Sequence, residues 1–256
     1  MVRSLSVWWN ASHVGRVSAE PERGLVFVYD PTWVADGRKP PISTSLGKRV
    51  EPYGAAVTRQ VFGSLLPRGS ARLAVAKALG ISTTHSFRLL EALGGDLAGA
   101  LCLGQSPPLP GLATAMPLSD GAMVRLLQDL AQPIWPAELN ALRVALPGAQ
   151  PKLPVVLAEG RVALAAPGQP TTHILKTSLD GQAETLDREV FAMRLAAALG
   201  LPVASMAFHR HATRRYLLLS RFDRRALTDG SVSRLHQESF RQRDRKSTRL
   251  NSSHRH

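Results

Sequence analysis

Gly148-Ala149-Gln150-Pro151-Lys152 opens the stretch of sequence that decides the fold. Thr172-His173-Ile174-Leu175-Lys176 follows as an apolar run that ends in a lysine, which predicts a strand. Residues 186–199 carry the clearest helical pattern in the chain, with Glu189 in their first half. Leu217-Leu218-Leu219-Ser220-Arg221-Phe222-Asp223 then predicts a strand that leads into a polar corner.

Further strands are expected around this helix. Residues 153–157 and 162–165 predict a hairpin whose turn is Glu159-Gly160, and residues 203–209 and 215–219 predict two more strands. Together these segments predict a small antiparallel sheet with one helix packed on it.

The N-terminal third predicts a second, curved antiparallel sheet. Residues 5–9, 14–17 and 25–29 are short apolar strands with turn signals between them. Trp8, Trp9 and Trp33 are expected to pack in its core. The fold class is therefore α+β.

Three helices should follow these strands. Residues 57–66 form the first, and Ser70 is expected to cap a second that turns Leu73, Ala76 and Leu79 inward and stops at Gly80. Ser82 or Thr83 is expected to cap a third with Phe87, Leu90 and Leu93 inward. Asp96 follows Gly94-Gly95, and we interpret it as a structural turn residue that bonds nearby backbone N–H groups.

Composition limits the classes of protein. The chain has 256 residues and one cysteine, Cys102, so a disulfide framework is excluded and a cytoplasmic location is expected. No apolar stretch approaches the roughly 18 residues of a spanning helix, so no membrane partner is expected. The net charge is +13, of which residues 234–256 carry +5. The remaining arginines are scattered, which favours a solvated basic surface, with a dedicated nucleic-acid patch as the alternative.

The ordered set of residues has the parts that a kinase small lobe uses to bind a nucleoside triphosphate. Such a site needs backbone N–H groups and a lysine at the phosphates, an acid to hold the lysine, and a hinge for the base. Lys176 and Glu189 are 13 positions apart and predict an ion pair, although both are equally compatible with solvated surface positions. The segment 148–152 lacks the glycines of a Walker loop and of the protein-kinase glycine-rich loop, so from the residues alone it is also a plain turn. His173 is expected to be a hydrogen-bonded strand residue rather than a metal ligand.

Several motifs, in order, resemble the HipA family of serine/threonine kinase toxins from type II toxin–antitoxin modules. They are Leu65-Leu66-Pro67-Arg68-Gly69, Gly94 to Ala100, Arg143 to Lys152, Thr172 to Lys176, Glu189 with Met193, Arg221-Phe222-Asp223-Arg224 and Leu235-His236-Gln237-Glu238. The resemblance covers residues 4–240. It implies a HipA-like N-terminal subdomain over residues 1–105, a linker with a short helix over 106–142 and an ATP-binding small lobe over 143–240.

The resemblance also implies a function. The family phosphorylates a protein serine with ATP and Mg²⁺, an aminoacyl-tRNA synthetase in characterised relatives. A helix-turn-helix, HipB-like antitoxin neutralises the toxin and brings it to operator DNA. By this resemblance, the nucleotide-binding residues are Gly148, Ala149, Gln150, Lys152, Lys176, Glu189, Arg221 and Phe222. The corner at Phe222 corresponds to the hinge, where backbone groups bond the adenine and the ring packs on it.

Two departures qualify that expectation. Ala145 stands where some family members have an autophosphorylated serine. The family's catalytic aspartate and metal ligands lie in a large lobe that has no counterpart after Glu238, so no catalytic residue and no metal ligand is assigned, and the chain as given is expected to be inactive. Residues 241–256 resemble a non-native or disordered tail, and a natural basic tail is the alternative. The alternative function is a non-enzymatic module, a split or decayed toxin that binds an antitoxin or another partner.

Overall fold

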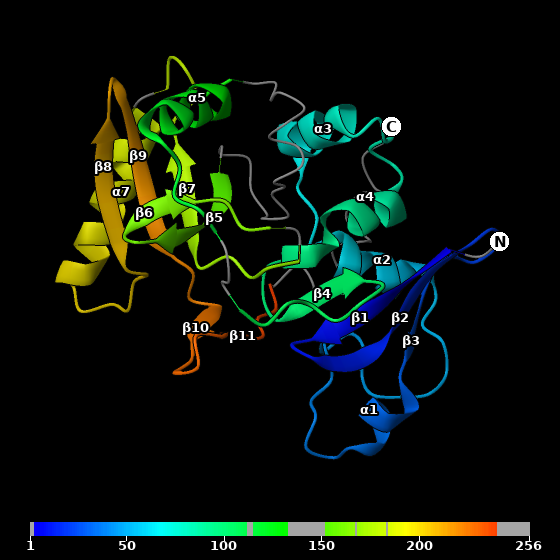
Figure 1. The fold of residues 1–256 in the computed structure, drawn as a ribbon. Coiled ribbons are helices and arrows are strands. Elements are labelled where there is room, and N and C mark those ends of the chain that lie inside the picture. Colours follow the sequence, from blue (N-terminus) through cyan, green and yellow to red (C-terminus); the bar gives the residue numbers. More distant parts are fainter. Residues whose placement is uncertain (1–2, 112–114, 133–151, 167, 183, 240–256) are drawn as a thin grey trace.

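Two larger antiparallel sheets, each with its own helices, and a separate two-stranded hairpin make up the described part of the molecule (Figure 1). The computed structural model describes residues 3–111, 115–132, 152–166, 168–182 and 184–239. The predicted α+β class is confirmed for these residues. The domain boundaries and the missing large lobe stay predictions.

The N-terminal sheet has the strand order β3-β2-β1-β4. Its strands are β1 (Arg3–Trp9), β2 (Ser12–Glu20), β3 (Gly24–Tyr29) and β4 (Leu101–Gly104). The first three confirm the predicted strands and extend them. The sequence analysis did not predict β4, which pairs with β1 from almost a hundred residues away, with Val7 opposite Leu103.

The helices of the N-terminal half contribute to the same hydrophobic core as this sheet. They are α1 (Pro31–Ala35), α2 (Ala55–Gly63), α3 (Gly69–Ala78) and α4 (Ser86–Leu93), followed by the 3-10 turn η1 (Gly94–Asp96). The inward face predicted for α4 is confirmed, because Phe87, Leu90 and Leu93 are all buried. Gly80 ends α3 as predicted: its φ is +61°, and the next N–H, of Ile81, donates to Ala76 O at 2.9 Å.

Three details of these helices were predicted wrongly. Leu73 is 61% exposed, because α3 packs through Val75 and Ala76 instead. The N-cap of α3 is Arg68 rather than Ser70, and the N-cap of α4 is His85, whose side chain makes no capping bond. The Ser82 hydroxyl accepts from the N–H of Thr84 and so belongs to the turn before α4.

Aromatic rings form the centre of the N-terminal core. Phe27 is fully buried and contacts Tyr29 and Phe62, with ring centroids 4.7 and 5.2 Å away. Trp33 is buried and lies against Trp9. The expected packing role is confirmed for both tryptophans, although Trp9 is only half-buried.

The second sheet has the order β6-β5-β7-β9-β8. Its strands are β5 (Lys152–Ala158), β6 (Arg161–Ala163), β7 (His173–Thr177), β8 (Met206–His211) and β9 (Arg214–Ser220). The predicted hairpin is confirmed: Glu159 and Gly160 both have positive φ, as a two-residue turn of type I′ requires.

Two helices, not the single one predicted, cover this sheet. α7 (Glu184–Ala198) packs Leu186 and Val190 on Leu217 and Leu219. α5 (Asp120–Leu130), placed in the linker by the sequence analysis, packs its apolar face against a cluster that includes Leu218. Because neighbouring residues of a strand point to opposite faces, α5 and α7 lie on opposite sides of the sheet.

Residues 224–239, at the end of the described chain, contact both halves of the molecule. β10 (Arg224–Ala226) and β11 (Val232–Arg234) form a short hairpin that Figure 1 places between the two sheets. After it, the ring of His236 lies 4.4 Å from that of Trp9, and the Glu238 carboxylate accepts from the Ser43 hydroxyl. This return brings residues 237–239 to the cavity described next.

Candidate functional site

A cavity of about 440 Å³ lies beside β7, β9 and α7, at the corner that follows β9. Its wall includes five of the residues assigned to nucleotide binding: Lys152, Lys176, Glu189, Arg221 and Phe222. Ala98 of the N-terminal half and Gln237 also line it, so both halves contribute to one site. The volume falls within the range of roughly 300–1,000 Å³ that is usual for small-molecule sites.

Lys176 and Glu189 form the ion pair predicted from their spacing. The alternation of β7 puts Lys176 on the same face as Ile174, toward α7, while Leu175 points to the other face. Glu189 lies one turn from Leu186 and next to Val190, the two residues that seat α7 on the sheet. The Lys176 and Glu189 side chains are 16% and 23% exposed, so the pair is shielded but reachable from the cavity.

Lys152 adds a second cation beside this pair. It lies directly opposite Lys176 across the β5–β7 ladder. Burial lowers the pKa of Lys152, the nearby Lys176 ammonium lowers it further, and Glu189 opposes both effects. The two ammonium groups beside the Glu189 carboxylate favour an anionic ligand in the cavity.

The corner after β9 separates Phe222 from Arg221. Phe222 is 71% exposed at the cavity, and among the described residues its backbone N–H and C=O have no hydrogen-bond partner. Arg221 points the other way, with its side chain 1% exposed in a buried cluster of charges. The assignment of Arg221 to nucleotide binding is therefore not supported for its side chain, whose donors are all turned toward protein groups.

His173 plays the part predicted for it. Its Nδ1 lies 2.8 Å from the Thr172 hydroxyl and its Nε2 3.4 Å from that of Ser220. Within the described ranges, no group of three metal-binding side chains occurs. Gly148, Ala149 and Gln150 lie outside the described residues, so their role at the phosphates stays a prediction.

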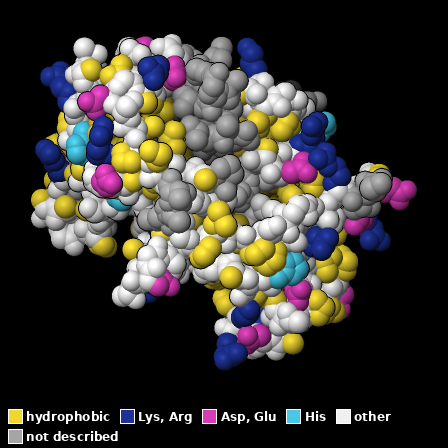
Figure 2. Space-filling view, in the orientation of Figure 1, with side chains coloured by type: hydrophobic (Ala, Val, Ile, Leu, Met, Phe, Trp, Pro, Cys, Tyr) yellow, Lys and Arg dark blue, Asp and Glu magenta, His cyan; other side chains and the backbone are white. Residues whose placement is uncertain are grey.

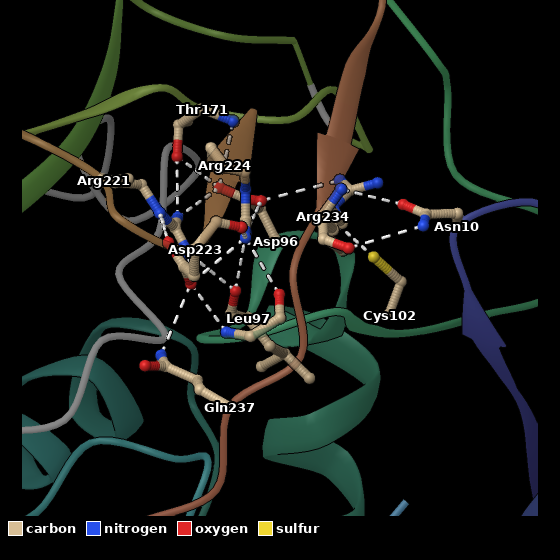
Figure 3. Close-up of polar contacts among 12 residues, drawn as sticks. Asn10, Asp96, Leu97, Cys102, Thr171, Arg221, Asp223, Arg224, Arg234 and Gln237 are labelled. Carbon is tan, nitrogen blue, oxygen red and sulfur yellow. Dashed lines mark hydrogen bonds and ion pairs between the residues drawn. The ribbon is translucent and has the colours of Figure 1, made fainter. Parts of the chain in front are cut away.

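The sequence analysis missed the charged cluster behind the corner, apart from Arg221 (Figure 3). It brings together two carboxylates and three guanidiniums, of which only the Asp96 side chain is more than 10% exposed: Asp96, Asp223, Arg221, Arg224 and Arg234. Asp96 is structural, as predicted, but the predicted partners were wrong. It accepts hydrogen bonds from Thr171, Arg221 and Arg224 and forms an ion pair with Arg234 at 3.5 Å, all 75 to 138 residues away, rather than accepting from nearby backbone N–H groups.

Burial raises the pKa of the Asp96 carboxyl, but Arg221, Arg224 and Arg234 together outweigh that effect and hold it below its ordinary value of 3.8. A carboxyl whose pKa is depressed in the folded state stabilises the fold fully above its unfolded pKa, and this stability is lost as the pH falls through the folded pKa.

We therefore expect the free energy of unfolding to fall steeply below about pH 4, where the unfolded chain binds the proton first. The slope should be shallower in Asp96→Asn, by up to about 1.4 kcal/mol per pH unit for one proton. Urea titrations between pH 3 and pH 6, about the range of carboxyl titration, measure both slopes. Equal slopes in the two proteins would show that Asp96 titrates normally.

The two halves of the chain that surround this site each match a known family of domains. Residues 5–104 match the HipA N-terminal domain, and residues 144–253 match the HipA-like C-terminal domain. The chain belongs to the HipA family. It is 43% identical over 246 residues to "Putative kinase Y4mE" of Sinorhizobium fredii, covering 93% of this chain and 58% of that protein.

Two further matches come from Shewanella oneidensis. The serine/threonine-protein kinase toxin HipA is 29% identical over 164 residues, covering 63% of this chain and 37% of the toxin. A chain in the solved complex of HipA, HipB and operator DNA matches with a TM-score of 0.71 and 25% identity, covering 91% of this chain and 54% of that one. The match thus covers between 37% and 58% of the length of these relatives.

The surface adds two observations. On the face shown in Figure 2, lysine and arginine side chains are spread over both halves rather than gathered in one patch. None of the helices in the described part of the chain has the length and apolar character needed to cross a bilayer.

Proposed function

We propose that this chain supplies the N-terminal subdomain and the ATP-binding lobe of a HipA-like serine/threonine protein kinase toxin. The observation that carries the proposal is the Lys176–Glu189 ion pair in the wall of a cavity of nucleotide size. A lysine held by a helical acid is how kinases place a cation on the phosphates of ATP. The exposed ring of Phe222, and its backbone groups that have no hydrogen-bond partner among the described residues, offer a surface for the base at the other end.

The strand register supports this division of the cavity. Lys176 lies opposite Leu217, and His173 lies opposite Ser220, two residues before Phe222. Three residues along a strand span about 10 Å. The cations and the aromatic ring are therefore separated along the cavity, as the phosphates and the base of one nucleotide are.

The described carboxylates at this cavity do not fit a Mg²⁺ site. Glu189 is paired with Lys176, Asp223 with Arg221, and Glu238 with the Ser43 hydroxyl. The proposal therefore assigns no metal ligand and no catalytic residue to the described part of the chain, and it derives no step through the metal.

The remaining parts of the proposal rest on the family. The reaction would transfer the γ-phosphoryl group of ATP to a protein serine, in an aminoacyl-tRNA synthetase or another cytoplasmic protein. The similarity to a HipA chain solved with HipB and operator DNA supports a HipB-like antitoxin as the partner and contact with DNA through it.

A double-mutant cycle tests the nucleotide site. Lys176→Ala and Glu189→Ala should each weaken ATP binding, and the double variant should bind little worse than the weaker single variant. Coupled neighbours show non-additivity of about 0.5–3 kcal/mol, whereas distant sites add to within about 0.5 kcal/mol. Calorimetric titration of ATP with Mg²⁺ into the four proteins measures the coupling.

The same helix provides a matched control. Glu184 and Arg188 form an ion pair on α7 with both side chains 80% exposed, so Arg188→Ala should leave ATP affinity unchanged. Equal ATP affinities in the parent, the two single variants and the double variant would contradict the assignment of Lys176 and Glu189 to the nucleotide site. An absence of ATP binding by the parent chain would favour the non-enzymatic interaction module instead.

A further inference from the structure

We propose that Asp96 of the N-terminal half is a positioning residue for the base end of the cavity, where it holds the Phe222 corner through the buried guanidinium of Arg221. The inference rests on the proposed nucleotide-binding function. Through Asp96, the N-terminal subdomain would help to position the nucleotide-binding residues rather than act as a separate module.

The contact between Asp96 and Arg221 joins the two halves of the molecule. Arg221 Nη1 donates to Asp96 Oδ2 at 3.0 Å, and Nη2 donates to the carbonyl oxygen of Leu97 at 2.9 Å. The Thr171 hydroxyl donates to the Asp96 carboxylate and accepts from Arg221 Nη1 at 2.9 Å. Planar guanidinium groups with several charge-assisted bonds are fixed in orientation as well as in position.

The residues on both sides of Phe222 are held in the same way (Figure 3). Asp223 accepts from Arg221 Nε and Nη2 at 2.9 and 2.8 Å, and from the backbone N–H of Gly99 at 2.7 Å. Arg224 Nη2 donates to Asp96 Oδ1 at 2.8 Å. Phe222 is the one residue of this corner whose side chain points out of the cluster, so the cluster fixes the backbone that presents its ring.

Gly99 allows this close approach. Its φ is +80°, and a Cβ there would lie 3.1 Å from Gln237 Cγ and 3.2 Å from Gln237 N. The loop that follows Asp96 therefore lies directly against residue 237, which itself lines the cavity.

Charge makes Asp96 the critical member. Two carboxylates face three guanidiniums in the cluster, and Asp96 contacts all three. Replacing Asp96 with asparagine leaves Asp223 alone to balance them. The excess buried positive charge then favours movement of Arg221 toward water, and Arg221 already lines the cavity.

The loss of affinity in Asp96→Asn should be confined to ligands that carry the base. Asp96→Asn should weaken the binding of adenosine and of ATP roughly tenfold, the scale of one lost hydrogen bond to a charged group. Binding of inorganic tripolyphosphate, which has no base, should stay within about twofold because Lys152 and Lys176 are untouched. Lys176→Ala should show the opposite pattern, with the larger loss for tripolyphosphate.

Calorimetry with adenosine, tripolyphosphate and ATP on the full chain tests the proposal. Thr171→Val is a milder variant of the same network, keeps the side-chain size, and carries the test if Asp96→Asn does not fold. Asp36→Asn is the matched control, because Asp36 pairs with the exposed Arg38 and does not line the cavity. This variant should bind every ligand as the parent does.

Three outcomes decide the matter. Selective loss of adenosine and ATP binding supports the positioning role. Parent-like adenosine affinity in folded Asp96→Asn and Thr171→Val, or an equal loss for adenosine and tripolyphosphate, overturns it while leaving the nucleotide site intact. A parent chain that binds none of the three ligands overturns the proposed function itself, and the positioning role with it.

Discussion

Replacing Arg221 with methionine is expected to lower the free energy of unfolding by about 3–5 kcal/mol. The guanidinium is 1% exposed and donates to Asp96, Asp223, Thr171 and the carbonyl oxygen of Leu97. Methionine fills much of the space but leaves two buried carboxylates with fewer cations and unmet hydrogen bonds. Removing one partner of a buried ion pair is costly for this reason, even where the intact pair adds little net stability.

Urea denaturation measures the effect, with Arg188→Met as the matched control. Arg188 is paired with Glu184 on the surface of α7, both side chains 80% exposed, so its loss should leave the denaturation midpoint unchanged. Midpoints that move equally in the two variants would mean that the charged cluster contributes nothing specific to stability.

The Lys176–Glu189 pair could be predicted from the sequence because each residue lies on a regular element. The alternation of one strand and the turn of one helix place both side chains on the interface between β7 and α7. The Glu159-Gly160 hairpin was predictable for a similar reason, since its turn is encoded by adjacent residues.

Asp96 and its partners could not be found in this way. The carboxylate contacts Thr171, Arg221, Arg224 and Arg234 only because segments far along the chain come back to it in the folded structure. No local period links residues so distant, and an aspartate among glycines has the composition of an ordinary turn. The same limit applies to β4, whose pairing with β1 is non-local.

The failures at α3 and α5 have a different cause. Helical periodicity shows that a helix has an apolar face but not which partner covers it. Leu73 fits an apolar stripe in the sequence, yet the structure turns Val75 and Ala76 to the core and leaves Leu73 exposed. α5 lies between proline-rich segments, which suggested a linker, although its Leu127 is fully buried against the second sheet.

Phe27→Ala should have the second large effect, a loss of about 3–5 kcal/mol in the free energy of unfolding. Phe27 is fully buried among Tyr29, Tyr53 and Phe62, so its removal leaves a cavity in the centre of the N-terminal core. Phe222→Ala is the same substitution at a 71% exposed ring, and it should leave stability within about 0.5 kcal/mol of the parent.

Adenosine binding should be affected in the other variant: it should weaken in Phe222→Ala and stay unchanged in Phe27→Ala. Phe222→Ala is expected to weaken adenosine binding by about 1–3 kcal/mol, the scale of stacking one base on an aromatic side chain, while tripolyphosphate binding is retained. Folded Phe27→Ala should bind adenosine as the parent does, because Phe27 does not line the cavity. Urea denaturation and calorimetry on both variants measure the two quantities independently. A stable Phe222→Ala protein with unchanged adenosine affinity would show that the ring at the corner does not contact the base, whatever the fate of the phosphate end.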